Sequence, residues 1–246
     1  MGIFRFKKFA VLNERSAMKV NTDGVLLGAA MTVRISDRNL LDVGTGTGTI
    51  ALMIAQRLAQ MQEADREEQL RIDAVDIDDV SVEEASSNFQ NSAWSRSLFA
   101  HHSSLKDFEE RTDLKYDLIF SNPPYFDCSL EAPQVRRSNA RHTSTGLSYR
   151  ELLEFADGGL TAEGRISLVL PADTEQELCR HARMCGLYLF RILRVRTVPR
   201  KSPVRIIAEF SRYRCESPED TLITIQDEGK YTEEYLSLMH DFYLFA

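Results

Sequence analysis

Short apolar runs alternate with longer amphipathic stretches over most of the chain. The apolar runs are rich in β-forming residues, and they predict strands near 39–43, 71–76, 97–102, 115–121 and 165–170. The stretches around them repeat apolar residues at helical spacing, and they predict helices over 22–33, 49–62, 79–91, 149–157 and 173–185. Strands that alternate with helices are typical of βαβ units. The pattern therefore predicts a doubly wound α/β fold with a mostly parallel sheet.

Two further strand-like runs, over 187–195 and 204–213, follow that core. In a doubly wound fold such runs form an antiparallel pair at the C-terminal edge, which completes a seven-stranded sheet. The chain has 246 residues, of which 43% are hydrophobic, and this is enough for one large α/β domain. No repeat or low-complexity tract marks a boundary, so we expect a single domain over 1–246.

The spacing of the cysteines and the lengths of the apolar runs indicate the cellular compartment of the protein. The four cysteines lack Cys-x-x-Cys spacing, so they indicate neither a zinc site nor a disulfide framework, and we expect no bound metal. No apolar run approaches the roughly 20 residues that span a bilayer, and the N-terminus lacks a continuous apolar signal-peptide core. The sequence thus predicts a cytoplasmic protein without membrane contact.

A glycine-rich turn, Asp42-Val-Gly44-Thr-Gly46-Thr-Gly48, follows the strand predicted over 39–43. Glycines permit positive φ and a close approach of the backbone to a ligand, and the next helix presents free N–H groups at its start. The nicotinamide fingerprint needs Gly-x-Gly-x-x-Gly, whereas these glycines alternate behind an aspartate. The spacing favours S-adenosylmethionine over a hydride-transfer cofactor.

An acidic residue, Asp76, ends the strand predicted over 71–76. Its carboxylate can accept both hydroxyls of a ribose. Because NAD enzymes use an acid at the same place, Asp76 indicates a ribose without identifying the cofactor. Asp78 and Asp79 are better suited to capping the helix that follows.

The strand predicted over 115–121 stops at Asn122-Pro123-Pro124-Tyr125, because proline cannot continue a sheet ladder. Pro123 also holds Asn122 in an extended conformation at the carboxyl end of the strand. The Asn122 side-chain oxygen and the Pro123 carbonyl would then accept the two hydrogens of a planar amino group, and Tyr125 would stack on its ring. An ordinary Asn-Pro turn after a strand explains the bare tetrapeptide equally well.

Basic residues gather after this motif and again near the C-terminus. The loop over 126–147 is long and carries Arg136, Arg137 and Arg141, where a polynucleotide would need cations for its phosphates. Arg200 and Lys201 belong to a second arginine-rich stretch. The net charge of −7 repels nucleic acid at long range, so a basic face requires an uneven charge distribution, and an ordinary salt-bridged surface is an equal alternative.

The chain resembles a family of tRNA (adenine-N6) methyltransferases, which modify the adenosine beside the anticodon of valine tRNA. Beyond the glycine turn and Ser121 to Tyr125, the resemblance rests on more particular blocks near the two ends. These blocks are Phe4-x-Phe6-Lys7-x-Phe9, Ala17-Met18-Lys19-Val20-x-Thr22-Asp23-Gly24-x-Leu26-Leu27-Gly28-Ala29, Val169-Leu170-Pro171 and Phe242-Tyr243-Leu244-Phe245.

This resemblance implies a Rossmann-like methyltransferase with three stretches: a covering segment over 1–34, a cofactor-binding core over 35–171, and an RNA-facing remainder over 172–246. It implies S-adenosylmethionine as cofactor and tRNA as partner, with no DNA and no obligate protein partner. The implied cofactor-binding residues are Lys19, Thr22, Asp42, Gly44, Gly46, Gly48, Asp76, Ile77, Ser104 and Asn122. The implied catalytic residues are Asn122, Pro123, Pro124 and Tyr125, and the implied RNA-binding residues are Tyr125, Phe126, Arg136, Arg137, Arg141, Arg200 and Lys201.

One departure and several alternatives accompany the resemblance. Ser103-Ser104 stands where relatives commonly place an aspartate for the cofactor's adenine, so a serine hydroxyl would have to replace it. Glutamine methyltransferases acting on proteins also present Asn-Pro-Pro-Tyr, to a planar amide. A DNA adenine or ribosomal guanine-N2 methyltransferase is a third alternative, although no separate target-recognition domain is evident. A catalytically silent tRNA-binding module is a fourth.

Overall fold

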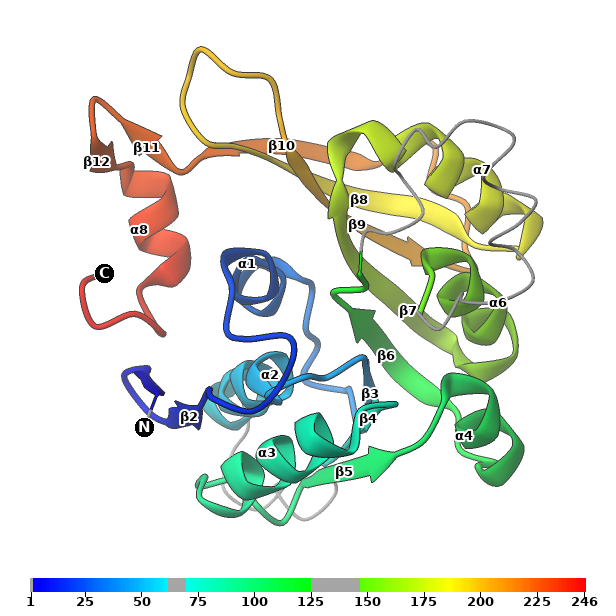
Figure 1. The fold of residues 1–246 in the computed structure, drawn as a ribbon. Helices are drawn as coiled ribbons and strands as arrows, with labels where there is room; N and C mark the ends of the chain where they lie inside the picture. Colours follow the sequence, from blue (N-terminus) through cyan, green and yellow to red (C-terminus); the bar gives the residue numbers. More distant parts are fainter. Residues whose placement is uncertain (1, 62–69, 125–146) are drawn as a thin grey trace, which may run out of the picture.

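An eight-stranded sheet runs through the middle of the molecule (Figure 1). The structure is a computed structural model, which describes residues 2–61, 70–124 and 147–246. The strand order is β10-β8-β9-β7-β6-β3-β4-β5, and β9 runs antiparallel to both of its neighbours whereas every other pair is parallel. The strands of this sheet are β3 (Asn39–Val43), β4 (Arg71–Asp76), β5 (Leu98–His102), β6 (Tyr116–Ser121), β7 (Leu160–Pro171), β8 (Tyr188–Arg196), β9 (Arg205–Ser211) and β10 (Glu219–Thr224).

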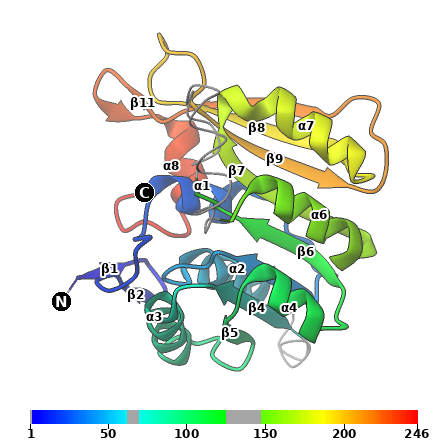
Figure 2. The ribbon, with the colours of Figure 1, turned by 45° about the vertical axis from the view of Figure 1, so that its right-hand side comes forward.

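Helices cover both faces of the sheet, because successive residues of each strand point to opposite sides. Leu40 of β3 packs into one core cluster and its neighbour Leu41 into the other. The helices of the first face are α1 (Thr22–Ala30), α2 (Thr49–Met61), α3 (Asp79–Gln90) and α8 (Glu233–Met239). The helices of the second face, side by side in Figure 2, are α4 (Leu105–Arg111), α6 (Tyr149–Gly159) and α7 (Glu175–Met184), and the 3₁₀ turn η3 (Ala172–Thr174) precedes α7.

The two ends of the chain meet beside α8 (Figure 1). Lys7 donates its backbone N–H to the Phe242 carbonyl, and its ammonium group bonds the carbonyls of His240 and Ala246. The Phe6 and Tyr243 rings stack with centroids 6.0 Å apart. The two terminal blocks of the resemblance therefore pack on each other. Two small hairpins complete the fold, β1 (Ile3–Arg5) with β2 (Ala10–Leu12) and β11 (Gln226–Asp227) with β12 (Lys230–Tyr231).

The predicted core elements are confirmed, and the differences have local causes. The β8–β9 pair is antiparallel as expected, but β10 pairs in parallel with β8 outside it, so the prediction of seven strands was wrong. β10 is mostly polar and exposed, and therefore lacks the apolar alternation that marks a strand. Helix α1 ends at Ala30, earlier than predicted, since the next turn is replaced by a hydrogen bond from Thr32 N–H to the Glu209 carboxylate.

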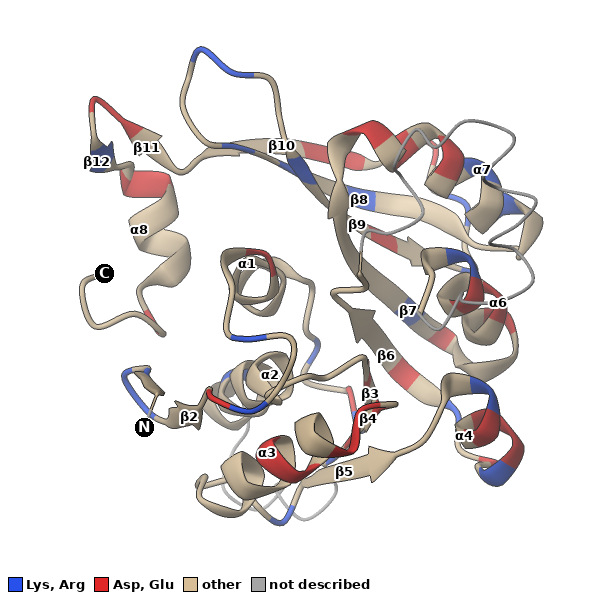
Figure 3. Ribbon diagram, in the orientation of Figure 1, with Lys and Arg blue, Asp and Glu red and all other residues tan. Residues whose placement is uncertain are grey.

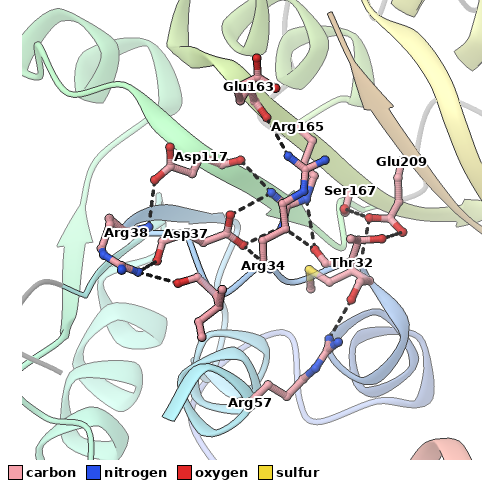
Figure 4. Close-up of polar contacts among 12 residues, drawn as sticks. Thr32, Arg34, Asp37, Arg38, Arg57, Asp117, Glu163, Arg165, Ser167 and Glu209 are labelled. Atoms are coloured by element: carbon pink, nitrogen blue, oxygen red, sulfur yellow. Dashed lines mark hydrogen bonds and ion pairs between the residues drawn. The ribbon is translucent and has the colours of Figure 1, made fainter. Parts of the chain in front are cut away.

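A buried polar network fixes the C-terminal end of α1 to the sheet (Figure 4). The Arg165 guanidinium on β7 is fully buried and bonds both Asp37 carboxylate oxygens, at 2.6 and 2.9 Å, and the Thr32 carbonyl at 2.7 Å. The Glu209 carboxylate on β9 accepts bonds from Thr32, from Ser167 and from the Arg191 guanidinium. The network thereby sets where α1 lies, and with it the N-terminal end of that helix.

Candidate active site

The glycine-rich turn joins β3 to α2 and is held against the end of β4. Gly44, Gly46 and Gly48 have φ angles of 72°, 55° and 78°, in the left-handed region that favours glycine. At Gly48 a Cβ would also overlap the Phe89 ring of α3. The N–H groups of Gly44 and Thr45 bond the Val75 carbonyl, so the turn lies at the carboxyl edge of the sheet.

Asp42, the last polar residue of β3, is fully buried beneath this turn. One of its carboxylate oxygens accepts a bond from the Thr45 hydroxyl at 2.8 Å, and the other, Oδ1, has no hydrogen-bond partner among the described residues. Burial raises the pKa of Asp42 to about 7, and the nearby Asp76 carboxylate adds to the rise while the Thr45 bond opposes it. A cationic group bound at Oδ1 would favour the charged carboxylate.

Asp76 ends β4 beside the turn. Its carboxylate accepts the N–H groups of Gly46, at 2.9 Å, and of Asp78, at 3.0 Å, which leaves lone pairs on both oxygens for a ligand. The next residue, Ile77, is 60% exposed, as an apolar wall for a flat ring would be. Asp78 caps α3 by accepting from Ser81 N–H, as the sequence predicts.

Ser104, the residue predicted to contact the cofactor's adenine, follows β5. Its hydroxyl caps α4, accepting the Asp107 N–H at 3.1 Å and donating to the Asp107 carboxylate at 2.7 Å. The hydroxyl of Ser103 donates to the Ser104 carbonyl. Both hydroxyls are therefore engaged locally, and the adenine contact of Ser104 stays a prediction.

Asn122 lies at the end of β6 and is buried, with 6% of its surface exposed. Its side-chain NH₂ donates to the Asn21 side-chain oxygen at 3.3 Å and approaches the Met18 sulfur at 3.7 Å. Asn21 in turn caps α1, accepting the Gly24 N–H at 2.8 Å. The chain before α1 therefore folds over the end of β6.

Two cavities meet at these side chains. The first lies under the glycine-rich turn, and its lining includes Lys19, Gly44, Thr45 and Thr49. The second, of about 640 Å³, opens in front of the two prolines and is also lined by Ala17 and Asp23. Three residues line both cavities: Met18, Asn21 and Asn122. We call the first, of about 20 Å³, the cofactor cavity and the second the acceptor cavity, after the roles that the resemblance implies for them.

The structure brings most of the predicted site residues together. Pro123 and Pro124 line the acceptor cavity and Lys19 lines the cofactor cavity, whereas Thr22 begins α1 on the surface and lines neither. Tyr125, Phe126, Arg136, Arg137 and Arg141 lie outside the described residues. Met18, Thr45 and Thr49 were not among the predicted site residues: Met18 and Thr45 lie inside quoted motifs, but nothing in the sequence shows that their side chains face the site.

Figure 3 shows where basic and acidic residues lie along the fold, and most arginines of the C-terminal stretch over 191–214 form ion pairs. Arg191 pairs with Glu209 and Glu219, and Arg194 pairs with Glu175 and Asp220. Arg200 and Lys201 differ, since they are exposed on the loop that joins β8 to β9 and form no ion pair within the described part of the chain. This loop leaves the carboxyl edge of the sheet, and the ion pair of Arg205 with Asp23 joins its base to α1.

These residues fit S-adenosylmethionine. The glycine turn admits close backbone contact, Asp42 with its unpartnered Oδ1 lies directly beneath that turn, and Asp76 with Ile77 suits the ribose and the adenine ring. When bound, the cofactor supplies a methyl group made electrophilic by a positively charged sulfur. Asn122 stands where the cavity for that group meets the acceptor cavity.

Comparison with known proteins agrees with this reading. The model of the methyltransferase small domain matches residues 15–177. The chain is 40% identical to tRNA1(Val) (adenine(37)-N6)-methyltransferase of Parabacteroides distasonis, over 98% of this chain and 97% of the relative. It is 38% identical to the protein of the same name from Flavobacterium psychrophilum, over 98% and 99%.

Solved structures support the fold. A predicted O-methyltransferase from Agrobacterium tumefaciens is similar with a TM-score of 0.62 and 16% identity, covering 89% of this chain and 96% of that one. A methyltransferase from Pyrococcus furiosus has a TM-score of 0.58 and 15% identity, covering 83% and 89%. Both confirm the Rossmann-like methyltransferase fold.

No helix among the described residues is long and apolar enough to cross a membrane.

The identity with these relatives extends over nearly the whole chain, including its two ends, and is not confined to the shared methyltransferase motifs. This level of identity establishes the family. The chain belongs to the tRNA1(Val) (adenine(37)-N6)-methyltransferase family.

Proposed function

We propose that the protein transfers the methyl group of S-adenosylmethionine to N6 of an adenosine in tRNA, at the position beside the anticodon of valine tRNA. The observation that carries the proposal is the place of Asn122, whose side chain lines both the cofactor cavity and the acceptor cavity. Membership of the family supplies the substrate, because its relatives carry this activity in their names.

The chemistry of the acceptor explains why an asparagine stands there. The lone pair of the adenine amine is delocalised into the ring, so the nitrogen is a poor nucleophile. We assign to the Asn122 side-chain oxygen and the Pro123 carbonyl the acceptance of the two amine hydrogens, which turns the lone pair toward the methyl group. Alignment and hydrogen bonding then lower the barrier without a metal or a side-chain nucleophile. The N–CH₃ bond forms as the S–CH₃ bond breaks, S-adenosylhomocysteine leaves as a neutral thioether, and the methylated nitrogen releases one of its protons to solvent.

The remaining predicted residues bind and orient. Asp42 and the glycine turn hold the methionine part of the cofactor, and Asp76 holds its ribose. Tyr125 stacks on the adenine, which must leave the stack of the anticodon loop to reach the cavity, and Phe126 adds an apolar wall. Arg136, Arg137, Arg141, Arg200 and Lys201 bind RNA phosphates.

A labelled methyl-transfer assay tests the proposal. The protein is incubated with radiolabelled S-adenosylmethionine and, in parallel, with tRNA lacking this modification, ribosomal protein or DNA, and the product is identified by nucleoside and amino-acid analysis. We expect label in N6-methyladenosine of tRNA alone. Label in glutamine or in DNA would replace the proposed substrate, and the absence of transfer to all three would favour a binding module.

An Asn122→Ala variant tests the role of the side chain. We expect kcat to fall by about 10²–10³-fold, the effect of removing one transition-state hydrogen-bonding group. Because Asn122 lies at a cavity wall, cofactor binding measured by calorimetry should change much less. Near-normal transfer by this variant would remove Asn122 from the mechanism.

A further inference from the structure

Asn21 and Asn122 lie 101 residues apart in the chain, yet their side chains meet where the two cavities join. We infer that Asn21 is a positioning residue for methyl transfer: its side-chain oxygen holds the Asn122 amide in the orientation that turns the Asn122 carbonyl away from α1 and toward the acceptor. The inference rests on the proposed function, because it deepens the role given there to Asn122.

Backbone groups fix which end of the Asn21 amide faces the site. Its oxygen accepts the Gly24 N–H at 2.8 Å, and its nitrogen donates to the Lys19 carbonyl at 3.0 Å. A backbone N–H can only donate and a backbone carbonyl can only accept, so the two ends of this amide are not interchangeable. The atom that Asn21 presents to Asn122 is therefore the oxygen.

The orientation of Asn122 follows from that of Asn21. An oxygen acceptor requires a donor opposite, so the Asn122 NH₂ faces Asn21 at 3.3 Å, with the Met18 sulfur as a weak second acceptor at 3.7 Å. Turning the Asn122 amide over would set two oxygens against each other with no hydrogen between them. Since Asn122 is buried, water can solvate only the exposed Asn21 side of this contact and offsets only part of that repulsion.

An inverted Asn122 amide would defeat catalysis. It would present an NH₂ group to the acceptor amine, so two donors would face each other and the amine hydrogens would lose their acceptor. The cofactor cavity would keep the rest of its lining, which includes Gly44, Thr45 and Thr47. Loss of the Asn21 contact should therefore lower kcat and leave cofactor affinity unchanged, whereas a helix-capping role alone would lower stability only.

Two substitutions separate these roles. Asn21→Ser keeps a good helix cap for Gly24, but its side chain is one bond shorter and does not reach Asn122. Asn21→Asp keeps both the cap and the oxygen acceptor, and loses only the bond to the Lys19 carbonyl on the exposed side. We expect kcat to fall by about tenfold or more in Asn21→Ser, in keeping with the sensitivity of such reactions to small misplacements, and to stay within about threefold of the unsubstituted protein in Asn21→Asp. Cofactor affinity should change by less than about threefold in both.

A spectroscopic measurement provides a readout besides activity. The Asn122 side-chain NH₂ signals are assigned by their absence in Asn122→Ala, and we expect them to shift and broaden in Asn21→Ser and to persist in Asn21→Asp. Full kcat in Asn21→Ser, or an equal loss in both Asn21 variants, would overturn the inference. Should Asn21→Ser not fold, Asn21→Gly is the substitute, since glycine is also an acceptable cap. Retained activity in Asn122→Ala would instead refute the proposed role of Asn122 itself.

Discussion

Two buried polar clusters differ in one respect, one at the C-terminal end of α1 and one beneath the glycine-rich turn. At the C-terminal end, the Arg165 and Glu209 side chains are fully buried and every charged group among Arg165, Asp37 and Glu209 has partners in the protein (Figure 4). Beneath the glycine-rich turn, the buried Asp42 keeps one carboxylate oxygen without a partner among the described residues. Burying polar atoms costs free energy in both clusters. In the first cluster, hydrogen bonds and ion pairs offset that cost, whereas Asp42 Oδ1 has no such partner among the described residues.

This difference distinguishes a polar cluster that stabilises the fold from one that has a hydrogen-bonding group left for a ligand. Three buried side-chain atoms among the described residues lack a partner, and Asp42 Oδ1 is the ionisable one. Unused hydrogen-bonding capacity at an ionisable group with a perturbed pKa indicates a place where a ligand binds. The saturated network holds the C-terminal end of α1, and Asn21 at the other end of that helix lines the same cavity as Thr45, the residue that bonds Asp42.

The largest effect is expected from breaking the saturated cluster. Asp37→Ala leaves the Arg165 guanidinium buried without its counter-ion, and the free energy of unfolding should fall by about 3–5 kcal/mol in chemical denaturation. Asp220→Ala is the matched control, because Asp220 also pairs with an arginine but is exposed, and it should cost less than about 1 kcal/mol. Equal losses in the two variants would remove the distinction between a buried network and surface pairs.

In the cluster with the unpartnered Asp42 oxygen, the substitution Asp42→Asn should change how the free energy of unfolding depends on pH. The folded-state pKa of Asp42 is about 7, above its unfolded value, so the folded protein holds an extra proton between about pH 4 and pH 7. The free energy of unfolding should therefore fall as the pH rises through this window, by at most about 1.4 kcal/mol per pH unit from this group. The amide introduced by the substitution cannot ionise, so the difference between the two denaturation profiles should widen up to about pH 7 and then level off.

The same substitution should weaken cofactor binding while it stabilises the protein above pH 7. In the unsubstituted protein, affinity for S-adenosylmethionine should rise between pH 6 and pH 8 as Asp42 ionises, and Asp42→Asn should abolish that rise in calorimetric titrations. Identical pH profiles in both proteins would show that Asp42 does not titrate in this range.

Two tyrosines near β6 offer a smaller contrast. Tyr116 is fully buried in the sheet with its hydroxyl 3.3 Å from Asp73, and Tyr125, outside the described residues, follows the strand. Tyr125→Ala should reduce kcat/KM by the equivalent of about 1–3 kcal/mol, the worth of one base-stacking contact, and Tyr125→Phe should retain it. Tyr116→Phe should instead reduce stability alone. Equal losses for both Tyr125 variants would mean that the hydroxyl is needed.

The smallest effect concerns charges on the surface. Replacing Arg200 and Lys201 together with Ala should weaken tRNA binding and lower the slope of log K against log salt by about 1–2, since each phosphate contact contributes a little less than one. Arg96 and Arg111, exposed and without ion pairs in the described chain, are the control pair. A slope unchanged from that of the control would place the tRNA on another surface.

The sequence by itself determined the order of the core elements and the identity of the strand-end residues. Asp42, Asp76 and Asn122 were recognised because each ends a short apolar run, and the period of two or of 3.6 residues that marks such elements is a local property. The carboxyl ends of neighbouring parallel strands lie at one edge of a sheet, so the topology alone brought these residues together. The helix predicted over 22–33 begins just after Asn21, but nothing in the sequence indicates that Asn21 reaches Asn122.

Only the tertiary structure decided which distant groups meet. The contact of Asn21 with Asn122, the burial that raises the pKa of Asp42, and the pairing of Arg191 and Arg194 with acids from other elements leave no periodic trace in the sequence. The arginine-rich stretch reads as one basic surface, yet four of its arginines form ion pairs, which leaves Arg200, Lys201 and Arg214 as exposed cations without an ion pair in the described chain. The physical reason is that hydrogen bonds, ion pairs and desolvation depend on three-dimensional distance, which the packing of the whole chain sets.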